Sequence, residues 1–481
     1  MAGGTATFDW KDGARVGVGA TSSLWIGPKK MLQVATDRLT RPFGEVYDDW
    51  MRQYAAEGPV LVNFRSLVGS NSGVDRYTHL LHSYPAKLLL NIPLFFLNCE
   101  QLGTGGRLLD PFCGTGTVLL EGLIARREII GCDSNPLARV ITSAKTTFIS
   151  RPEVEHVLEE LKKVIPSRGS AAPTGTVRLE RWFTPKACMA LSRLTRGIGR
   201  LPPSTATTFL TACASATIGR LSLTDPRISV PVQLDPSRPG LTDAQRVERV
   251  AWLASRQRAD AFAVFERTVF DNLARMDRLR TQLGPWPAPR ILADARVASS
   301  EGLVDLVITS PPYASAQKYI RASSLSLQWL GLAPNGLRHL ERRNIGCEHW
   351  GRNDLLGPLD DIIPSAREVL AQVGEINPLR CHIAAQFLRD MADSIREISR
   401  AVRHGGHMVL VIGNNVVAGH SFDSRTYLSD IAAECGFRLE LELIDPIRSR
   451  GLMTKRAGTA GLIAHEWILV FRRVASEPSD V

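Results

Sequence analysis

The chain has 481 residues, of which 44% are hydrophobic and 22% are charged, and this composition is typical of a folded globular protein with more than one domain. Its formal net charge of +10 makes a polyanionic partner plausible, although charge bears on association and not on fold. The eight cysteines include no CxxC pair, which argues against a zinc knuckle or a disulfide framework.

No run of the sequence reaches the roughly 18 apolar residues that span a bilayer. The first residues also lack the apolar core of a signal peptide. We therefore expect a soluble, cytoplasmic protein.

Alternating strands and helices begin near residue 107, well after residues 1–65, which carry no motif and are treated as an N-terminal extension. RLLD at 107–110 is a short apolar strand, followed by the tight turn GTGT and the amphipathic helix VLLEGLIARR. EIIGCD at 128–133 is a second strand, and PLARVITSAKTTF is a second helix with Pro136 at its start. This βαβα order predicts a parallel sheet with helices packed on its faces.

Residues 151–288 interrupt this alternation. They open with the charged helix VEHVLEELKKV, pass through the linker PSRGSAAPTG and continue as a mostly helical, arginine-dotted stretch, which predicts an inserted helical subdomain. Strand patterns return at 290–296, 303–310 and 407–415, and RLELELI and EWILVFRR form a closing antiparallel pair. The alternating part is thus divided into 66–150 and 289–475, which leaves a tail of 476–481.

LLDPFCGTGTVLLEG at 108–122 is the first stretch that indicates a binding site. A strand that ends in Asp110, then Gly114 and Gly116, then a helix is a layout that lets the backbone approach a cofactor closely. The spacing is neither GxGxxG nor that of a P-loop, which disfavours dinucleotide binding and nucleotide hydrolysis. Asp133 ends the next strand, where a carboxylate suits the two hydroxyls of a ribose. The pattern predicts a nucleoside pocket, and a plain glycine turn with a capping aspartate is the alternative.

A rigid corner follows the apolar strand LVDLVI, where the chain reads TSPPY at 309–313. Each proline fixes φ, removes a backbone donor and pushes the preceding residue toward extended geometry. The corner therefore holds a hydroxyl, two carbonyl groups and an aromatic ring stiffly at a strand end. Taken alone the motif is short, and a proline-rich turn with a packed tyrosine is the alternative.

In chain order, DPFCGTGT, GCDSNPLA and SPPY resemble the S-adenosylmethionine-dependent amino-methyltransferases, in particular the DNA N4-cytosine/N6-adenine methylase family. HSYPAK at 82–87, LADAR at 292–296 and HEWILVFRR near the C-terminus extend the resemblance, which covers 75–150 and 288–475. It implies an α/β, Rossmann-like methyltransferase fold with a mixed seven-stranded sheet and helices on both faces. It also implies S-adenosyl-L-methionine as cofactor and double-stranded DNA as partner. A cognate restriction endonuclease or another defence-system subunit is a further candidate partner.

The resemblance also implies roles for individual residues. Ser310 Oγ and the Pro311 carbonyl would accept hydrogen bonds from the amine of a flipped-out base. Pro312 would keep that carbonyl aimed, and Tyr313 would offer a face for stacking the base. No metal is implied. The residues implied in cofactor binding, with Asp294 near the adenine amine, are Tyr84, Pro85, Lys87, Asp110, Pro111, Phe112, Cys113, Gly114, Thr115, Gly116, Thr117, Asp133, Ser134, Asn135, Asp294 and Ala295.

We expect the DNA contacts among basic side chains, which neutralise phosphates and make affinity depend on salt. The insertion is a candidate for DNA contact and target recognition. The basic candidates are Arg178, Arg181, Arg193, Arg196 and Arg200 in the insertion, Arg342 and Arg343 beyond the catalytic helix, and Arg448, Arg450, Lys455 and Arg456 in the final loop.

Several alternatives remain open at this point. Serine before PPY favours the N4 of cytosine, because adenine enzymes of this family more often carry Asp or Asn there, and adenine N6 is the near alternative. An RNA guanine-N2 methyltransferase is another, since DPFCGTGT also resembles that group, although residues 1–70 show no clear RNA-binding platform. A third is a non-catalytic DNA-binding subunit, against which the intact Asp110, Asp133 and SPPY argue. Cys113 is not expected to be a nucleophile, because amine methylation needs none.

Overall fold

A computed structural model describes residues 23–25, 31–33, 41–67, 77–84, 87–169, 172–173, 175, 177–314, 319–350, 359–447 and 463–474. Its centre is an eight-stranded sheet with the strand order β3-β11-β12-β8-β7-β4-β5-β6. The strands of this sheet are β3 (Val60–Leu61), β4 (Arg107–Asp110), β5 (Glu128–Cys132), β6 (Arg290–Leu292), β7 (Val304–Thr309), β8 (Val402–Ile412), β11 (Phe437–Pro446) and β12 (His465–Arg473). Two short antiparallel pairs lie apart from it, namely β1 (Ser23–Trp25) with β2 (Met31–Gln33) and β9 (Asn415–Val417) with β10 (His420–Phe422).

The pairing of the strands confirms the predicted mixed sheet. β4 pairs in parallel with β5 and β7, while β6 adds in parallel to β5 and β8 adds in parallel to β7. β12 is antiparallel to both β8 and β11, as predicted for the closing pair. Seven strands give the Rossmann-like methyltransferase arrangement, and β3 adds an eighth, parallel to β11.

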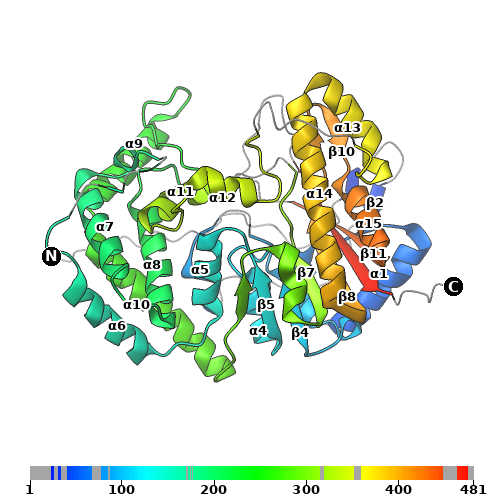
Figure 1. The fold of residues 1–481 in the computed structure, drawn as a ribbon, viewed down its shortest axis with the longest axis horizontal. Helices are drawn as coiled ribbons and strands as arrows, with labels where there is room; N and C mark the ends of the chain where they lie inside the picture. The colour runs from blue at the N-terminus through cyan, green and yellow to red at the C-terminus, as the bar shows by residue number, and fades with distance from the viewer. Residues whose placement is uncertain are drawn as a thin grey trace.

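Helices cover both faces of the sheet (Figure 1). Successive side chains of a strand point to opposite faces, so Leu108 of β4 packs in the core with α3 and α4, whereas Leu109 packs in the core with α13, α14 and α15. The helices are α1 (Phe43–Glu57), α2 (Phe64–Leu67), η1 (Tyr77–Leu81), α3 (Asn91–Leu97), η2 (Glu100–Leu102), α4 (Thr117–Ile124), α5 (Pro136–Thr146), α6 (Arg151–Val164), η3 (Leu179–Arg181), α7 (Pro185–Ile198), α8 (Thr205–Leu221), α9 (Asp243–Arg258), α10 (Ala261–Leu283), η4 (Ala295–Glu301), α11 (Tyr319–Trp329), α12 (Leu337–Arg343), α13 (Pro364–Ile376), α14 (Pro378–Ala401) and α15 (Ser424–Glu434).

The eighth strand comes from the segment that we treated as an N-terminal extension. α1, β3 and α2 pack into the main core, where the rings of Trp50 and Phe64 lie 4.7 and 5.7 Å from that of Phe95. The domain boundary expected at residue 65 therefore falls inside the sheet domain. A two-residue strand is too short to show a periodic pattern in the sequence, which is why it was missed.

The insertion forms a helical body beside the sheet domain, at the left of Figure 1. α8 is at its centre and packs against α6, α7 and α10. α8 also contacts α5 and α11, and its buried Phe209 and Leu210 belong to the same apolar core as one face of the sheet. In the described ranges no helix is both long and apolar enough to cross a membrane.

Lys145 on α5 is a lysine buried inside this core. Its side chain is 0% exposed, and within the described residues its Nζ has no hydrogen-bond partner. Burial lowers its pKa well below the ordinary 10.5, because the charged ammonium loses its hydration. Between the lowered native pKa and 10.5 the unfolded chain therefore binds more protons than the native one, and stability should rise as the pH rises through that range.

We expect Lys145→Met to raise the free energy of unfolding by about 1–3 kcal/mol at pH 7, the usual cost of a buried unsatisfied polar group. Urea denaturation at pH 7 and at pH 9 measures this free energy. Between pH 7 and pH 9 the free energy of unfolding should rise less in Lys145→Met than in the wild type. The control is Lys163→Met, since Lys163 is exposed and pairs with Glu160 at 2.7 Å, and it should change stability by less than about 0.5 kcal/mol. A destabilised Lys145→Met protein would mean that the ammonium is stabilised in the native state.

Candidate active site

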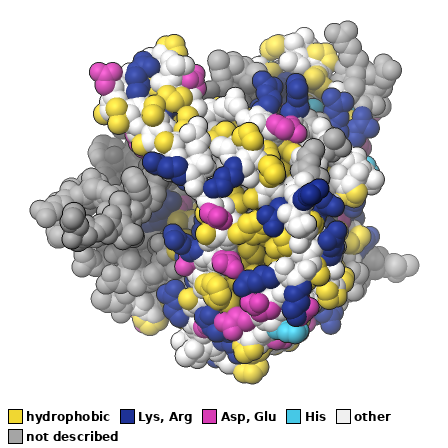
Figure 2. All heavy atoms as spheres, turned by 90° about the vertical axis from the view of Figure 1, so that its left-hand side faces the viewer, with side chains coloured by type: hydrophobic (Ala, Val, Ile, Leu, Met, Phe, Trp, Pro, Cys, Tyr) yellow, Lys and Arg dark blue, Asp and Glu magenta, His cyan; other side chains and the backbone are white. Residues whose placement is uncertain are grey.

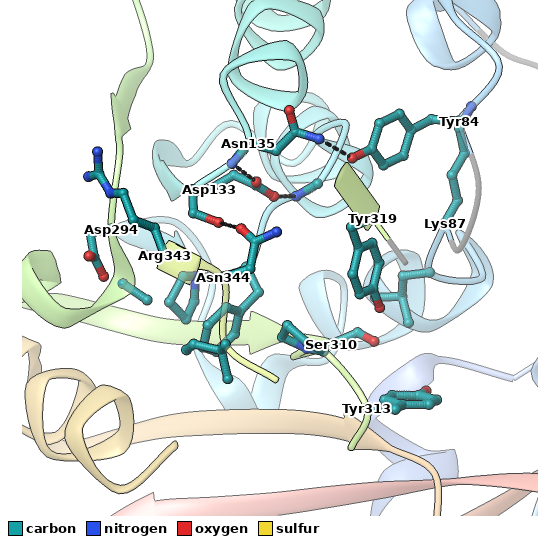
Figure 3. A pocket seen from close by; sticks show the side chains of 18 of the residues that line it. Tyr84, Lys87, Asp133, Asn135, Asp294, Ser310, Tyr313, Tyr319, Arg343 and Asn344 are labelled. Atoms are coloured by element: carbon teal, nitrogen blue, oxygen red, sulfur yellow. Dashed lines mark hydrogen bonds between the residues drawn. The ribbon is translucent and has the colours of Figure 1, made fainter. Parts of the chain in front are cut away.

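An open cavity of about 250 Å³ lies at the carboxyl ends of β4, β5 and β7 (Figure 3). The chain adds β5 and β6 on one side of β4 but β7 and β8 on the other, so the strand order reverses here. Loops diverge at such a switch point and leave a crevice for ligands. The cavity is lined by Tyr84, Lys87, Leu88, Pro111, Phe112, Gly114, Asp133, Ser134, Asn135, Asp294, Ala295, Ser310, Pro312, Tyr313, Tyr319, Arg343, Asn344, Ile345, Ile447, Ile463 and Glu466.

The glycine loop between β4 and α4 forms one wall of the cavity. Gly114 and Gly116 have φ angles of +52° and +73°, which residues with a Cβ rarely adopt. A Cβ on Gly116 would lie 2.8 Å from Thr142 Cγ2, whereas one on Gly114 would meet only open space. Thr142 Oγ1 donates a hydrogen bond to the Gly114 carbonyl at 2.9 Å, so α5 fixes the loop. The loop therefore presents bare backbone to a ligand.

Asp133 follows β5 and faces the same cavity. Its Oδ2 accepts a hydrogen bond from the Gly114 N–H at 3.0 Å, and its Oδ1 accepts one from the Asn135 N–H at 2.7 Å. Burial raises its pKa to about 6, so the carboxyl group is mostly ionised at neutral pH. The remaining lone pairs can accept hydrogen bonds from the hydroxyls of a ribose, which is the role expected from the sequence.

Asn135 links this carboxylate to the opposite wall. Its side-chain oxygen accepts a hydrogen bond from the Leu137 N–H at 3.0 Å and so caps α5. Its Nδ2 donates to the Tyr84 hydroxyl at 2.8 Å, as drawn in Figure 3, and to Ser323 Oγ at 3.1 Å. One side chain thus fixes both the start of α5 and the position of Tyr84.

Asp110 borders a smaller cavity of about 40 Å³ next to the main one. The side chain is 3% exposed, and its Oδ1 accepts hydrogen bonds from Thr309 Oγ1 at 2.6 Å and from the Phe112 N–H at 3.2 Å. Burial raises its pKa to about 7. Lys87 and Ser310 line both cavities, so the two spaces adjoin.

The proline corner lies across the cavity from the glycine loop. Ser310, Pro312 and Tyr313 all line the main cavity, while Pro311 is buried and does not. The Tyr313 hydroxyl donates a hydrogen bond to Glu466 Oε1 at 2.8 Å, and the tyrosine is only partly buried. The ring is therefore accessible from the cavity rather than packed in the interior, which argues against the reading of TSPPY as a plain turn.

The structure brings most of the residues predicted for the site to these two cavities. Cys113, Thr115 and Thr117 line the smaller one together with Asp110. Gly116 lines neither cavity, but its positive φ angle helps to form the loop. Pro85 lies outside the described residues. Asp294 reaches the main cavity, but its carboxylate is engaged by Arg296, whose Nε and Nη2 donate to it at 2.9 and 2.8 Å.

Sequence reasoning missed part of the lining. Tyr319 and Glu466 lie in segments that resemble the methylase family, yet no short motif marked them. Arg343 was expected to contact DNA, but it lines the cavity, where its charge acts on Asp294. Asn344 was not foreseen either, and it accepts a hydrogen bond from the Ser134 hydroxyl. The other missed residues are Leu88, Ile345, Ile447 and Ile463.

Two other predicted DNA contacts, Arg193 and Arg200, make contacts within the protein, and four lie outside the described residues. The Arg193 Nε donates to the Pro166 carbonyl at 2.7 Å, and the guanidinium lies 5.1 Å from the centre of the Phe262 ring. Arg200 Nη1 donates to the Val164 carbonyl at 3.0 Å. The basic residues of the final loop, Arg448, Arg450, Lys455 and Arg456, are not among the described residues.

Cys113 and His82 have the properties of structural residues. Burial raises the pKa of the Cys113 thiol well above its ordinary value, so a nucleophilic thiolate is disfavoured. His82 Nε2 lies 2.9 Å from Ser215 Oγ, and burial lowers the pKa of this histidine to about 3. Over the described ranges no three His, Cys, Asp or Glu side chains are grouped so as to hold a metal ion.

Comparison with known proteins finds similarity to methyltransferases. Residues 79–161 match the model of a family described as an RMKL-like, methyltransferase domain. Over 391 residues the chain is 24% identical to the type II methyltransferase M.MvaI of Kocuria varians, covering 75% of this chain and 82% of that protein. Over 171 residues it is 26% identical to the type II methyltransferase M.AvaI of a Nostoc species, covering 33% of this chain and 35% of that protein.

Two further matches concern enzymes that are named for RNA. Over 83 residues the chain is 29% identical to the tRNA (guanine(10)-N2)-dimethyltransferase of Methanothermobacter thermautotrophicus, covering 16% of this chain and 25% of that protein. The solved structure of the rRNA methyltransferase aviRa from Streptomyces viridochromogenes is 11% identical and covers 85% of this chain and 96% of that one, with a TM-score of 0.29.

The residues present fit S-adenosylmethionine. The bare backbone at Gly114 allows close approach, the ionised Asp133 suits a ribose, and a smaller space at Asp110 adjoins the main cavity. The chain thus has a Rossmann-like methyltransferase fold with a cavity whose residues fit S-adenosylmethionine. By sequence it is similar to two type II methyltransferases.

Proposed function

We propose that this protein methylates the exocyclic amine of a base in double-stranded DNA, with the N4 of cytosine as the favoured acceptor. The observation that carries the proposal is that one cavity joins Ser310 and Tyr313 of the proline corner to Asp133 and Gly114. An amine bound at the corner would therefore lie next to a cofactor bound at the glycine loop. DNA as the substrate is supported by the sequence resemblance and by the type II relatives.

S-adenosylmethionine, when bound, supplies a methyl group on a positively charged sulfur. Asp133 would accept hydrogen bonds from its ribose hydroxyls, and the backbone at Gly114 would pack against it. Lys87 donates a hydrogen bond to the His82 carbonyl at 2.8 Å and lines both cavities. It would contact the methionine end of the cofactor. These groups orient the cofactor and need not move during the reaction.

The proline corner would act on the acceptor amine. An exocyclic amine is a poor nucleophile because its lone pair is delocalised into the ring. Ser310 Oγ and the Pro311 carbonyl would accept hydrogen bonds from its two N–H groups, hold the nitrogen in a pyramidal geometry and so restore its nucleophilicity. The methyl group would then pass directly to nitrogen as its bond to sulfur breaks, leaving the neutral thioether S-adenosylhomocysteine, and the methylated nitrogen would release one of its protons to solvent. No covalent enzyme intermediate is needed. The base must first leave the duplex, which costs a few kcal/mol.

A labelling assay tests the reaction and its acceptor together. Purified protein is incubated with methyl-labelled cofactor and unmethylated duplex DNA or RNA, the product is digested to nucleosides, and the Ser310→Ala variant is the matched control. We expect the label in N4-methylcytosine. Label in N6-methyladenine would correct the base and keep the reaction, whereas label on RNA with none on DNA would overturn the proposal.

We further propose that the helical insertion provides the DNA-binding surface. Residues 151–288 contain 21 Lys and Arg but only 13 Asp and Glu, a net charge of +8 out of +10 for the whole chain. Figure 2 shows the side of the molecule that carries the insertion, where basic side chains are spread over the described surface. A surface of this kind attracts a polyanion without regard to its sequence.

Arg178 and Arg181 are the best placed to test this surface. Both are exposed, and the neighbouring Val177 N–H donates to Gln328 of α11 at 2.9 Å, so they lie beside the helix that begins with the cavity residue Tyr319. We expect Arg178→Gln/Arg181→Gln to weaken DNA binding and to lower the slope of log affinity against log salt by up to about 1.8, since each phosphate contact contributes about 0.9. Cofactor affinity should not change.

The matched control removes two exposed arginines from the opposite part of the molecule. Arg396 and Arg400 of α14 pair with Asp393 and Glu397 of the same helix. Arg396→Gln/Arg400→Gln should leave the salt slope as in the wild type. An equal change in both double variants would indicate a general charge effect and would contradict a binding surface on the insertion.

A further inference from the structure

Glu466 is the hydrogen-bond partner of Tyr313, the aromatic residue of the proline corner. Tyr313 follows β7 and Glu466 is on β12, with β8 between these strands, yet the tyrosine hydroxyl donates to Glu466 Oε1 at 2.8 Å. Both residues line the main cavity, and Figure 3 shows Tyr313 at its lower edge. The hydrogen bond therefore spans the sheet and engages the hydroxyl at the far end of the ring.

Gly413, directly after β8, fixes the ring from the side. A Cβ on Gly413 would lie 3.1 Å from Tyr313 Cε2 and 2.7 Å from Ile463 Cγ2. The φ angle of Gly413 is not in the left-handed region, so the backbone does not require glycine there. Glycine is required because the Tyr313 ring and Ile463 occupy the space that a Cβ would need.

We propose that Glu466 and Gly413 are positioning residues that hold the Tyr313 ring in the plane on which the target base stacks. This inference rests on the proposed function and identifies residues that determine how the base is bound. Glu466 restrains the ring through the hydroxyl, and Gly413 allows the ring to approach β8. A ring fixed before the base arrives loses less side-chain entropy on binding than a mobile one.

The arrangement also assigns the tyrosine hydroxyl to the protein and not to the base. Burial raises the pKa of Glu466, and the hydrogen bond from Tyr313 opposes this shift. A hydroxyl already donated to a partly buried carboxyl group is not available to donate to a base. Tyr313 would then act through the face of its ring, and Tyr313→Phe should be harmful because the link to Glu466 is lost.

The test measures methyl transfer with DNA as the varied substrate for Glu466→Ala, Glu466→Gln, Tyr313→Phe and the double variant Tyr313→Phe/Glu466→Ala. We expect Glu466→Ala and Tyr313→Phe each to lower kcat/KM for DNA about tenfold, mainly through a higher KM for DNA. The affinity for the cofactor should not change. The double variant should be no worse than either single one. Glu466→Gln should stay within about threefold of the wild type, because its amide oxygen still accepts from the hydroxyl.

Gly413→Ala is an independent variant that leaves the hydrogen-bonding groups in place. Its methyl group would crowd the ring, and we expect a loss similar to that of Glu466→Ala. The inference would be overturned if the loss of kcat/KM in the double variant equalled the product of the losses in Tyr313→Phe and Glu466→Ala. It would also be overturned if Glu466→Gln were as impaired as Glu466→Ala. The wild-type protein in the same assay distinguishes the proposed function from the positioning role. If the wild type transfers no methyl group to DNA, the proposed function is contradicted. If it does, but the effects of Tyr313→Phe and Glu466→Ala are independent, only the positioning role is contradicted.

Discussion

Asp133→Ala is expected to weaken the binding of S-adenosylmethionine about tenfold to a hundredfold, measured by isothermal titration calorimetry. The change removes the carboxylate that would accept hydrogen bonds from the ribose, and hydrogen bonds to charged groups contribute about 1.5–3 kcal/mol. Because burial raises the pKa of Asp133 to about 6, the wild-type affinity should also fall as the pH is lowered through that value. Asp133→Asn lacks this titrating group and should lack that part of the pH dependence.

The control for this experiment is an aspartate with a similar structural role outside the cavity. Asp305 accepts a hydrogen bond from the Arg107 N–H at 2.6 Å and pairs with Arg403 at 2.5 Å. Asp305→Ala should lower the stability of the fold without changing cofactor affinity. Such a control is needed because Asp133 also accepts hydrogen bonds from the Gly114 and Asn135 N–H groups, and its loss loosens the loop. Wild-type affinity in Asp133→Ala would remove the ribose role.

Ser310→Ala is expected to lower kcat about a hundredfold while the cofactor binds as in the wild type. The serine hydroxyl would be one of the two acceptors that activate the amine, and loss of one preorganised polar group at a reacting centre typically costs about a hundredfold or more in rate. Single-turnover measurements with saturating cofactor and DNA report the chemical step, and calorimetry reports the cofactor affinity.

Ser324→Ala is the matched control for Ser310→Ala. Ser324 lies on α11 near the site, its hydroxyl donates to the Arg321 carbonyl at 2.7 Å, and it does not line the cavity. This variant should keep the wild-type rate. If Ser310→Ala and Ser324→Ala are equally active, Ser310 is only a turn residue and the proposed activation of the amine is wrong.

The class of fold and the centre of the site were accessible from the sequence because their signals are local. Asp110, Asp133 and Ser310 each follow a short apolar strand, and parallel strands align their carboxyl ends on one edge of a sheet. Once a βαβα order is recognised, residues at successive strand ends are expected to meet. The structure does bring Asp133 and Ser310 to one cavity.

The rest of the site depends on contacts between distant segments. Glu466 reaches Tyr313 only because β12 is inserted beside β8 in antiparallel orientation, and nothing near residue 466 marks this. Gly413 would be taken for a turn glycine until the ring of Tyr313 is seen against it. Arg343 could be assigned to the cavity only after the position of α12 was known.

The sequence by itself thus determined the alternation of strands and helices, the glycine loop, the carboxylate of Asp133 after the second strand and the proline corner, since each follows from the chemistry of a few consecutive residues. Only the tertiary structure decided that α1 and β3 belong to the sheet domain, which side chains complete the cavity, and how the Tyr313 ring is fixed. The physical reason is that strand order and side-chain neighbours are set by the packing of the whole core, which no short stretch of sequence encodes.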